Sequence, residues 1–534
     1  MAPETDVLIV GGGPTGLALA ISLHKQGVKF RIVDSESGPA QHSRALAVHA
    51  RILELYRQLD LADDLLGLGY KLPATNIWVE GKHRAHISLR DFGEGLTPYP
   101  YILIVPQDAH ERVLERKLKT HGIFVERRTK LEGFVDSGSS ITAKLVRQDD
   151  GTEITCEASY IVGCDGAHSV VRHQIGAKYE GGTYVPLFYI ADVEAEEQDS
   201  PLFNGEAHVT FVEDTFNLIL PYAQERRVRL IGITIPKTNE TRQDHKLPES
   251  HPEVTFEDVL PDIKRVSGIE IKKVNWFSPY RSHHRVASTF HKNRAFLVGD
   301  AAHIHSPVGG QGMNTGIMDV FNLAWKLATV ITQNLMTEEA KTRLLDSYET
   351  ERRSFALSVS GATDRGFTLL TTPGFLSHML RAWIIPYMAP LVTRFQYMRM
   401  GVFRRASQLI CSYRDSPLNH ESGESETVQP GDRVPWAKTD SADNFETLQY
   451  LCWQLHVYGE PWPNLSEWCQ KMNIRLTVFP WDKKYGEVGL KKDAAYLIRP
   501  DHYIAGIFKG ESILLKLDGY FSTHGLTCAR PLSH

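Results

Sequence analysis

The sequence predicts an α/β fold, in which a Rossmann-like nucleotide-binding domain is combined with a β-rich second domain and a smaller C-terminal domain. Three observations predict this fold. A glycine-rich turn follows an apolar strand at the N-terminus, an acid–glycine pair follows a second apolar strand before residue 165, and a third strand before residue 299 leads into a glycine-rich loop and a long helix. Each is a strand that runs into a helix, the unit from which doubly wound α/β domains are built.

The first of these units carries a dinucleotide-binding fingerprint. The apolar segment 6–10 leads into GGGPTG, a helix is predicted over 17–26, and a second strand is predicted over 29–33. Glycines at the first, third and sixth positions allow the tight turn, the close approach of a pyrophosphate and the packing of the helix on the sheet. These glycines are Gly11, Gly13 and Gly16.

An acidic residue ends the second strand of this unit. Asp34 lies about twenty residues beyond the glycines, where an acid binds the adenosine ribose of a dinucleotide. Its charge would repel a 2′-phosphate, so we do not expect this site to bind NADP. Glu36 is the alternative, although it lies past the predicted strand end. A glycine-rich turn that binds nothing is the structural alternative for the whole motif.

The second unit is YIVGCDGAHSVVR, residues 160–172. Its strand ends at Asp165-Gly166, and Ser169 is placed to cap the helix that follows. By itself this segment indicates only a capped helix. Its position between the other two units favours a ligand-binding role over a simple capped helix.

The third unit begins at Arg294, ends its strand near Asp300 and enters a long helix near Met313. An acid at a strand end can accept a ribityl or ribose hydroxyl. The helix N-terminus offers free backbone N–H groups and the positive end of the helix dipole to a group that develops negative charge. Glycines between them let the backbone approach a planar ring. The loop contains Pro307, Gly309, Gly310 and Gly312.

The three motifs, in this order and at these separations, resemble the single-component flavoprotein aromatic hydroxylases typified by p-hydroxybenzoate hydroxylase. The segment HIHSPVGGQGMNTGIMDVFNLAWKLA is most similar to the phenol hydroxylase branch, and the resemblance covers residues 5–365. It implies FAD as cofactor, with the ADP part at the first motif and the ribityl chain at Asp300. The residues that it places along the isoalloxazine are Pro307, Gly310, Gly312, Met313 and Asn314.

The resemblance implies further cofactor contacts and a reaction. Asp165 is linked in the family to both FAD and nicotinamide cofactor binding. Arg44 in HSRALAVHAR and Gln107 in VPQDAHERVL match two FAD contacts, with a surface arginine and a helix N-terminal glutamine as the alternatives. In the family, NADPH or NADH reduces the flavin, and O2 then forms a C4a-hydroperoxyflavin that hydroxylates the substrate.

We therefore predict a single-component FAD-dependent monooxygenase that hydroxylates an electron-rich aromatic substrate, phenolic or polyketide-type, with O2 and NAD(P)H. Baeyer–Villiger oxygenation or epoxidation of a polycyclic natural product is the alternative reaction. An inactive flavin-binding scaffold is the non-enzymatic alternative. Flavin halogenases share the fold, but their WxWxIP segment is absent.

Substrate-contacting residues are predicted from position. The phenol hydroxylases carry an Asp where this chain has Leu46, which argues against a simple phenol. His49 can titrate near neutral pH, or it packs under the flavin as a structural histidine. Tyr222, at a strand end, can donate to a phenol oxygen or is an ordinary edge tyrosine. Arg281 can orient an anionic substrate or the pyridine nucleotide together with its basic neighbours. Alternatively, these residues form a solvated basic turn. The neighbours are His283, His284 and Arg285. Pro307 is a further candidate for the substrate pocket.

The motif positions divide the N-terminal part of the chain between two domains. Residues 1–73, 106–179 and 291–370 are predicted to form the FAD-binding domain. Residues 74–105 and 180–290 contain alternating β-type segments and are predicted to form the substrate-binding domain. A sheet of this kind could cover the flavin ring and form a substrate pocket between the domains.

The remainder is predicted to form a helical segment and a further domain. Residues 371–415 read as helical, and a polar linker follows. Residues 430–534 resemble the thioredoxin-like C-terminal domain of phenol hydroxylase relatives, and the absence of CxxC predicts that this domain is not redox-active.

Composition and charge limit the partners. The chain has 534 residues, a net charge of −5 and a pI of about 6.5, which give no reason to expect nucleic acid or an anionic membrane as partner. Six cysteines without CxxC or a histidine at ligand spacing predict a reducing compartment and no metal. Residues 1–5 are too short for a signal peptide, so we expect a cytoplasmic location. The oligomeric state is open, with a homodimer as one alternative.

One apolar stretch lies within the predicted helical segment. Residues 382–392 are broken by Pro386 and Pro390 and flanked by arginines. No apolar run reaches transmembrane length. A packed helical hairpin is the prediction, and a membrane-surface patch is the alternative.

Overall fold

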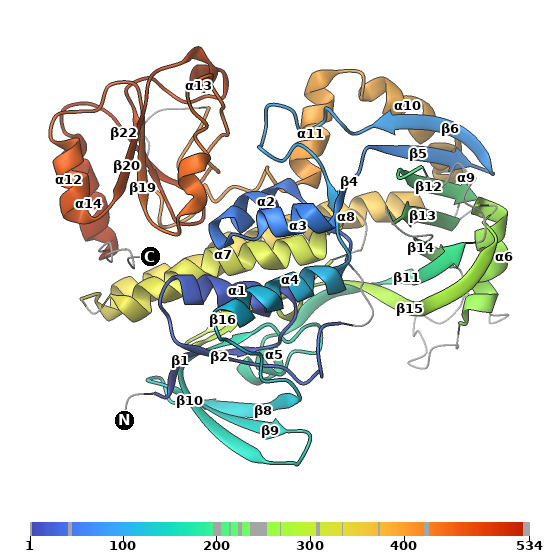
Figure 1. Ribbon diagram of the computed structural model, residues 1–534, viewed down its shortest axis with the longest axis horizontal. Coiled ribbons are helices and arrows are strands. Elements are labelled where there is room, and N and C mark those ends of the chain that lie inside the picture. Colours follow the sequence, from blue (N-terminus) through green and yellow to red (C-terminus); the bar gives the residue numbers. More distant parts are fainter. Residues whose placement is uncertain are drawn as a thin grey trace.

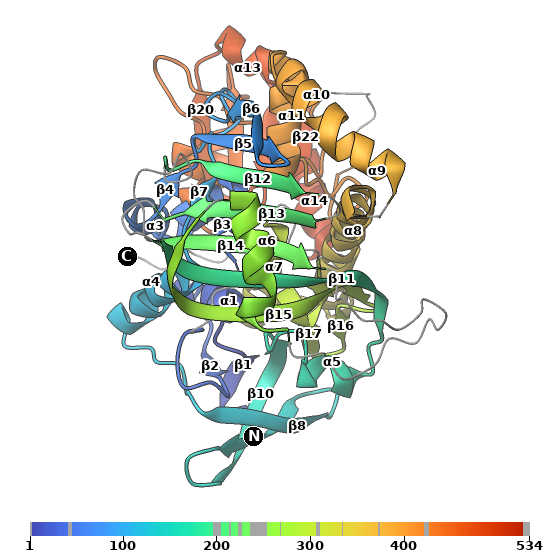
Figure 2. The ribbon, with the colours of Figure 1, turned by 90° about the vertical axis from the view of Figure 1, so that its right-hand side faces the viewer.

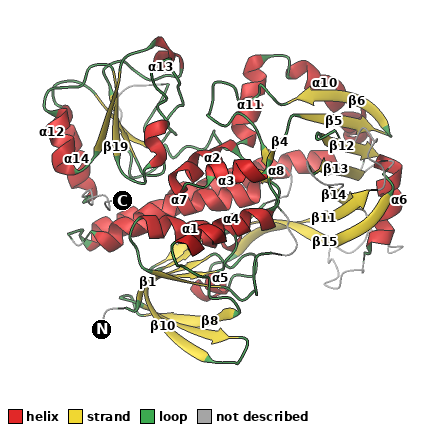
Figure 3. Ribbon diagram, in the orientation of Figure 1, coloured by secondary structure: helices red, strands yellow, loops and turns green. Residues whose placement is uncertain are grey.

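The structure is a computed structural model, and its description is confined to part of the chain. The described residues are 3–40, 45–195, 204–212, 215–222, 227–234, 254–267, 269–305, 310–333, 335–371, 374–420 and 427–526. A nucleotide-binding sheet, a second larger sheet and a C-terminal sheet surround a central group of helices (Figures 1 and 3). This is the mixed α/β architecture that the sequence predicts.

The first sheet places the three predicted strand ends side by side. Its order is β16-β17-β10-β1-β2, and the pairs β17–β10, β10–β1 and β1–β2 are parallel. The hairpin β8–β9 extends it by pairing antiparallel with β10. The strands are β1 (Thr5–Val10), β2 (Phe30–Val33), β8 (Thr129–Asp136), β9 (Ile141–Arg147), β10 (Glu153–Gly163), β16 (His291–Lys292) and β17 (Ala295–Leu297). Because carboxyl ends of adjacent parallel strands share one edge, the three motifs meet there.

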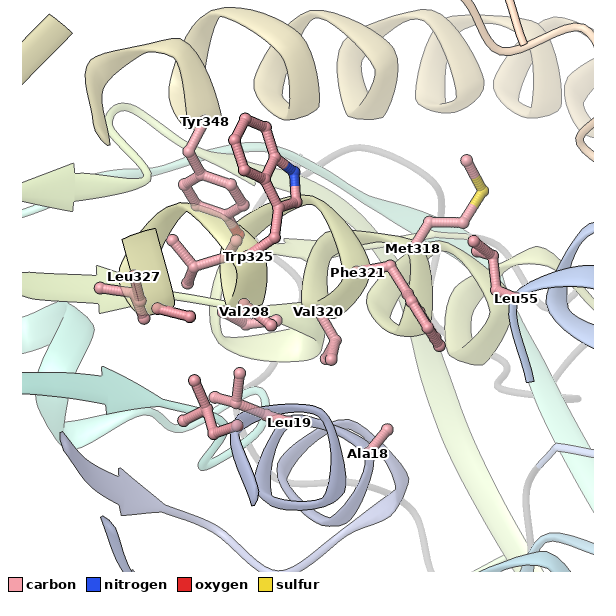
Figure 4. Packing of buried hydrophobic residues seen from close by; sticks show 14 of the residues in the cluster. Ala18, Leu19, Leu55, Val298, Met318, Val320, Phe321, Trp325, Leu327 and Tyr348 are labelled. Atoms are coloured by element: carbon pink, nitrogen blue, oxygen red, sulfur yellow. The ribbon is translucent and has the colours of Figure 1, made fainter. Parts of the chain in front are cut away.

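Helices cover this sheet and hold the third motif in place. They are α1 (Pro14–Lys25), α4 (Gln107–Thr120), α5 (Val170–Ile175), α7 (Gln311–Thr332) and α8 (Glu338–Thr371). Figure 4 shows Val320 of α7 between that helix and Ala18 and Leu19 of α1. The Tyr348 hydroxyl of α8 donates to the Leu297 carbonyl at 2.7 Å, just before the third strand end. Since α7 is buried along most of its length, its N-terminus is held firmly beside the sheet edge.

The second sheet is built around two long antiparallel strands. Its order is β18-β15-β11-β14-β13-β12-β5-β6, and Figure 2 shows β11 and β15 crossing the width of the molecule. The elements are β5 (Ala74–Val79), β6 (Lys82–Ser88), β11 (Tyr179–Ala195), β12 (Ala207–Val212), β13 (Thr215–Pro221), β14 (Arg227–Thr234), α6 (Phe256–Ser267), β15 (Ile271–Ala287) and β18 (His303–Ile304). A parallel pairing of β5 with β12 joins the two predicted parts of the β-rich domain.

A small sheet and two short helices connect these layers. The sheet has the order β3-β7-β4. These elements are β3 (Ala47–Val48), α2 (Ala50–Tyr56), η1 (Arg57–Leu59), α3 (Ala62–Leu68), β4 (Tyr70–Lys71) and β7 (Leu103–Ile104). The predicted domain boundary at residue 105 therefore includes a strand that pairs outside the second sheet. The exact domain bounds stay predictions.

The helical segment follows the long α8 and runs over the second sheet. It comprises α9 (Phe375–Met379), the π-helical turn η4 (Leu380–Ile384), α10 (Ile385–Val392) and α11 (Gln396–Ala406). Within the predicted helical segment 371–415 the described helices end at Ala406, and the bounds of the segment stay a prediction. None of the described helices combines the length and the apolar composition that crossing a membrane requires.

The C-terminal sheet has the order β20-β19-β21-β22, with β19 and β20 parallel and the other pairs antiparallel. Its elements are η5 (Glu446–Gln449), β19 (Gln454–Tyr458), α12 (Leu465–Met472), β20 (Arg475–Phe479), α13 (Lys483–Glu487), β21 (Ala495–Ile498), β22 (Ile504–Phe508) and α14 (Ile513–His524). This βαβαββα arrangement agrees with a thioredoxin-like domain, an assignment that stays a prediction. Burial raises the pKa of the Cys452 thiol to about 11 and that of Cys469 to about 12, so both are protonated at neutral pH.

Buried ion pairs attach this domain to the central helices. Arg499 donates to both carboxylate oxygens of Glu351 on α8, at 2.5 and 2.8 Å. Lys326 of α7 donates to the same carboxylate at 2.7 Å, and Asp501 accepts from Arg499 at 2.6 Å. Burial opposes ionisation of Glu351, but the positive charges of Arg499 and Lys326 outweigh it and hold the carboxylate pKa well below its usual range.

Candidate active site

The first glycine turn is shaped by close backbone contacts. Gly11 has φ +109°, and a Cβ there would lie 2.2 Å from the Cys164 carbonyl oxygen. A Cβ at Gly16 would lie 1.9 Å from the Gly11 carbonyl oxygen. A Cβ at Gly13, in contrast, would meet no described atom within 4 Å. Gly13 is the N-cap of α1, where no described side chain makes a capping hydrogen bond, so the helix N-terminus opens onto space suited to a pyrophosphate.

Asp34 lies against this turn, as predicted from the fingerprint. Its carboxylate accepts hydrogen bonds from the backbone N–H of Gly12 and, at 2.7 Å, from that of Glu36. Arg127 lies 3.4 Å from the same carboxylate and was not identified from the sequence. Glu36 has an exposed side chain beyond the strand. The geometry therefore favours Asp34 over Glu36 as the ribose ligand.

Asp165 is half-buried, and its two carboxylate oxygens differ in their hydrogen bonds. Its Oδ2 accepts from the backbone N–H of Val170 at 2.7 Å, whereas Oδ1 has no hydrogen-bond partner among the described residues. Burial raises the pKa of this carboxyl. Ser169 caps α5 by accepting from the Arg172 N–H at 2.9 Å, which confirms the predicted cap. A buried acceptor without a protein donor is suited to a ligand hydroxyl.

Asp300 lies in the short η3 turn (Gly299–Ala301), with an exposed side chain. A Cβ at Gly299 would lie 2.8 Å from Thr15 Oγ1 at the start of α1, and one at Gly316 of α7 would lie 3.0 Å from the Gly299 Cα. The first and third motifs therefore touch. Asp300 stands beside the α1 N-terminus, where a cofactor that spans both motifs would extend its ribityl chain.

The N-terminus of α7 faces the loop before α2. Gly310 is its N-cap with φ +62°, and a Cβ there would lie 3.1 Å from Ala47 Cβ and 3.7 Å from His49 Nε2. Asn314 donates to the Ala47 carbonyl at 2.9 Å and accepts from the His49 N–H at 2.9 Å. Its side chain thus fixes the loop. At Gly312, where a Cβ would meet no described atom within 4 Å, the backbone has room for a ring.

A buried carboxylate behind this turn was missed from the sequence. Asp319 of α7 accepts from the Gly299 N–H at 3.0 Å, from His303 Nε2 at 2.7 Å and from Arg352 Nε at 2.6 Å. Burial opposes its ionisation, but the charges of His303 and Arg352 outweigh it and lower the carboxylate pKa. The sequence signal was the one acid in a mainly apolar helix. Asp319 positions the turn that carries Asp300.

His305 packs beside this network. Its ring lies 4.9 Å from that of His303, and neither ring nitrogen has a hydrogen-bond partner among the described residues. Burial lowers its pKa to about 3, so the imidazole is neutral.

Of three further residues predicted to contact the cofactor or the substrate, the structure describes one. Arg44 and Pro307 lie outside the described residues. Gln107 begins α4, where its side chain donates to Glu111 at 2.8 Å and accepts from the Ala45 N–H at 3.2 Å. It therefore anchors the segment that leads to His49.

An apolar cluster adjoins the α7 N-terminus on the side of the second sheet. Leu46 is buried in it, so no carboxylate occupies that position. The cluster joins the small sheet to β12 and β13, and its core consists of Leu46, Leu72, Ile104, Ala207 and Leu220. Met313, next along α7, packs partly buried against the main core. The arrangement places a buried apolar cluster beside the N-terminus of α7.

Tyr222 packs at the border of this cluster. Its hydroxyl donates to Asp192 Oδ2 at 3.4 Å and accepts from Arg229 Nη2 at 2.7 Å. Burial raises its pKa. Tyr222 is therefore a neutral hydroxyl within a protein network, and donation to a substrate would compete with Asp192.

A group of basic side chains from α5 and β15 lies next to η3. Arg172 donates to the Ala301 carbonyl at 3.1 Å and stacks over the Tyr179 ring at 4.0 Å. His283 lies 2.8 Å from Thr183 Oγ1, and burial together with the nearby charge of Arg285 lowers its pKa. Arg281 precedes them on β15, as a half-buried side chain. The cluster is cationic and close to Asp300.

Comparison with known proteins agrees with this geometry. The model of the family described as FAD binding domain matches residues 4–363. The 6-methylpretetramide 4-monooxygenase of Streptomyces rimosus is 30% identical, over 98% of this chain and 92% of its own. The OxyS anhydrotetracycline hydroxylase of the same species superimposes with a TM-score of 0.74 at 25% identity, covering 97% of this chain and 98% of its own. The flavin-dependent monooxygenase PieE, solved with FAD and substrate, has the same fold, with a TM-score of 0.77 at 19% identity, covering 98% and 100%.

Proposed function

We propose that this chain, which belongs to the FAD binding domain family and is a flavoprotein monooxygenase, hydroxylates an electron-rich aromatic substrate of the polyketide type. The observation that carries the proposal is the contact of three features at one sheet edge. They are the open N-terminus of α1, the α7 N-terminus beside Asp300, and the apolar cluster that contains Leu46.

The residues at this edge fit FAD. Bound FAD supplies a hydride acceptor for NAD(P)H and a centre for the activation of O2. The α1 N-terminus at Gly13 would bind the pyrophosphate, Asp34 the adenosine ribose and Asp300 the ribityl chain. Asp165 Oδ1, which is buried without a described donor, offers a further acceptor. The N–H groups of Gly312 and Met313 at the α7 N-terminus would stabilise negative charge on the ring.

The surroundings of Leu46 favour a large apolar substrate over a small phenol. A carboxylate at that position would be available to take a phenol proton, but leucine cannot do so. The buried cluster instead offers leucine and isoleucine side chains to a fused ring system. The same apolar wall would exclude water from the reacting atoms. The tetracycline-type relatives, which are named for polycyclic substrates, support this choice.

His49 and Tyr222 remain candidates for contact with the substrate. His49 is buried with its Nε2 facing the α7 N-cap. Tyr222 belongs to the Asp192–Arg229 network. We propose that His49 lines the ring-binding turn and that Tyr222 orients a substrate oxygen through this network.

The cationic cluster beside η3 would bind the phosphates of NAD(P)H. The sequence contains one dinucleotide fingerprint, and that one is assigned to FAD. The reductant therefore needs a surface without its own Rossmann motif. Arg172 and Arg285 supply permanent charge next to Asp300, and Arg281 extends the cluster along β15. A cytoplasmic location, where the free cysteines would stay reduced, completes the proposal.

The activity test measures NADH and NADPH consumption against a panel of phenols and polycyclic polyketides. We expect consumption coupled to a product heavier by one oxygen atom, with the new hydroxyl located by NMR on an aromatic carbon. A lactone or an epoxide would redirect the proposal to the alternative reactions. Consumption that no aromatic compound stimulates would contradict it.

The cofactor assignment has a separate test in Asp300→Ala. Loss of one charge-assisted hydrogen bond of about 1.5–3 kcal/mol should lower FAD affinity about tenfold to a hundredfold. Flavin fluorescence titration of the apoprotein measures it. Asp149→Ala, which removes an exposed carboxylate paired with Arg128, is the control and should leave affinity unchanged. Unchanged affinity in Asp300→Ala would exclude the assigned role.

A further inference from the structure

The segment from α9 to α11 packs one apolar face against the second sheet. Ala382, Ile385 and Ala389 contact the cluster formed by the strands β5, β6 and β12. These three residues recur at helical spacing, so they define the inner face of η4 and α10. In Figure 2, α9, α10 and α11 lie along one outer border of the molecule. Their inner face is therefore already covered by this chain.

The outer face of the same helices is also apolar. Trp383 is 60% exposed, Tyr387 53%, Phe395 63% and Tyr397 84%. The Trp383 and Tyr387 rings stack with their centroids 6.3 Å apart. Further exposed apolar side chains in the segment are Met379, Ile384, Met388, Leu391, Met398 and Val402. A helix that is apolar on both faces normally has both faces covered, and a surface of this kind marks an interaction site.

The charge of this segment differs from that of the whole chain. Residues 375–406 contain five arginines and no aspartate or glutamate, although the chain has a net charge of −5. Arg394, Arg404 and Arg405 are exposed. The expectation that net charge gives no reason for an anionic membrane partner therefore does not hold for this local surface.

The charge pattern distinguishes between two occupants. A second copy of the chain in a two-fold dimer would place this surface against itself, because isologous interfaces pair the same patch on both subunits. Arginines of both copies would then meet without any acid from the segment to offset them. An anionic lipid surface offers the opposite charge together with an apolar layer. Tryptophan, tyrosine and arginine are also the residue types enriched at membrane interfaces.

We propose that the outer face of residues 379–405 docks on an anionic lipid membrane surface. The aromatic side chains enter the headgroup boundary, and the exposed arginines bind lipid phosphates and carboxylates. The helices lie on the surface and do not cross it. Because α10 packs on β6, docking brings the second sheet close to the lipid, from which a polycyclic substrate of the kind proposed above would partition. The docking itself does not depend on that substrate.

The test is cosedimentation of the full-length, FAD-loaded protein with vesicles. One set contains phosphatidylcholine with about 30 mol% phosphatidylserine, and the other contains phosphatidylcholine alone. We expect binding to the anionic vesicles at least about tenfold stronger than to the neutral ones, and weaker binding at high salt. Arg404→Glu with Arg405→Glu, and separately Trp383→Gln with Tyr387→Gln, should each lower binding at least about tenfold.

Leu515→Gln is the matched control, since Leu515 is 75% exposed on α14 of the C-terminal domain. It should bind vesicles like the unsubstituted protein. Bound-flavin absorbance and melting temperature verify that each variant is folded. Absence of vesicle binding by the unsubstituted protein, or equal losses in the control, would overturn the proposal. A dimer seen by analytical ultracentrifugation that Trp383→Gln with Tyr387→Gln dissociates, without vesicle binding, would assign the surface to a second copy instead.

Discussion

Two buried polar clusters of this protein differ in how their hydrogen bonds are completed. At the interface with the C-terminal domain, both oxygens of Glu351 accept from Arg499, and Lys326, Asn322 and Ser416 also donate to this carboxylate. At the candidate cofactor site, Asp165 Oδ1 and both ring nitrogens of His305 have no partner within the described part of the chain. In the first cluster protein groups supply the hydrogen bonds of the central carboxylate. In the second, which we call the open cluster, the named atoms lack a described protein partner.

The difference separates a structural role from a functional one. A buried polar atom without a partner costs about 1–3 kcal/mol, so native proteins rarely keep one without a reason. The closed network needs nothing further and holds α7 and α8 against the C-terminal domain. The open atoms lie behind the turns that the sequence assigns to FAD. We therefore expect changes in the first cluster to reduce stability, and changes near the second to reduce ligand binding.

The largest effect is expected from Glu351→Ala. Removal of this carboxylate leaves Arg499 and Lys326 buried without their shared counter-charge, which should cost about 3–5 kcal/mol of unfolding free energy. Urea unfolding of the FAD-loaded protein measures the loss. Asp149→Ala, which breaks the exposed pair with Arg128, should cost less than about 1 kcal/mol. Equal losses in the two variants would mean that the buried network is not structural.

Two glycine substitutions distinguish a structural glycine from a ligand-binding glycine within the candidate cofactor site. Gly11→Ala places a Cβ 2.2 Å from a carbonyl oxygen at positive φ, so we expect it to damage the fold itself. Gly13→Ala meets no described protein atom within 4 Å, so the apoprotein should keep its melting temperature. Its methyl group would occupy pyrophosphate space and lower FAD affinity about tenfold or more, about 1.4 kcal/mol. Normal FAD affinity in Gly13→Ala would show that the open space at α1 is not the phosphate site.

The sequence predicted the parts of the site that depend on local order. The glycine spacing, the strand ends and the Ser169 cap all follow from residues close together in the chain, and the structure confirms the elements that carry them. The position of Asp34 against the turn also follows from a strand–helix–strand unit.

The features that the sequence did not predict are mainly contacts between residues far apart in the chain. Asp319 lies 33 residues from Arg352, and Glu351 lies 148 residues from Arg499, and no local pattern links them. The small sheet was missed because strands of two residues leave no periodicity to detect. The apolar stretch of α10 is visible in the sequence, with a surface patch as one alternative, but the sequence alone cannot show which side of this helix the sheet covers.

The smallest effect concerns His305 and pH. Burial holds its folded pKa at about 3, below the ordinary value of 6.5. Below pH 6.5 the unfolded chain therefore binds a proton that the folded chain does not bind. The stability associated with the neutral ring is present above that pH and is lost as pH falls, by about 1.4 kcal/mol per pH unit.

His305→Gln removes this titration. The slope of unfolding free energy against pH, measured by urea unfolding over the unit below pH 6.5, should decrease by up to about 1.4 kcal/mol per unit. His456→Gln is the reference from the C-terminal domain, because burial also holds its pKa at about 3 but its ring contacts the Thr447 hydroxyl at 2.9 Å. Both variants should flatten the slope similarly, since burial sets both pKa values. Among described groups, only His456→Gln should also break hydrogen bonds, those to the Thr447 and Tyr458 hydroxyls, and lose about 0.5–1.5 kcal/mol for each at neutral pH. An unchanged slope in His305→Gln would mean that this ring gains a proton in the folded state, and that the open cluster is solvated rather than kept for a ligand.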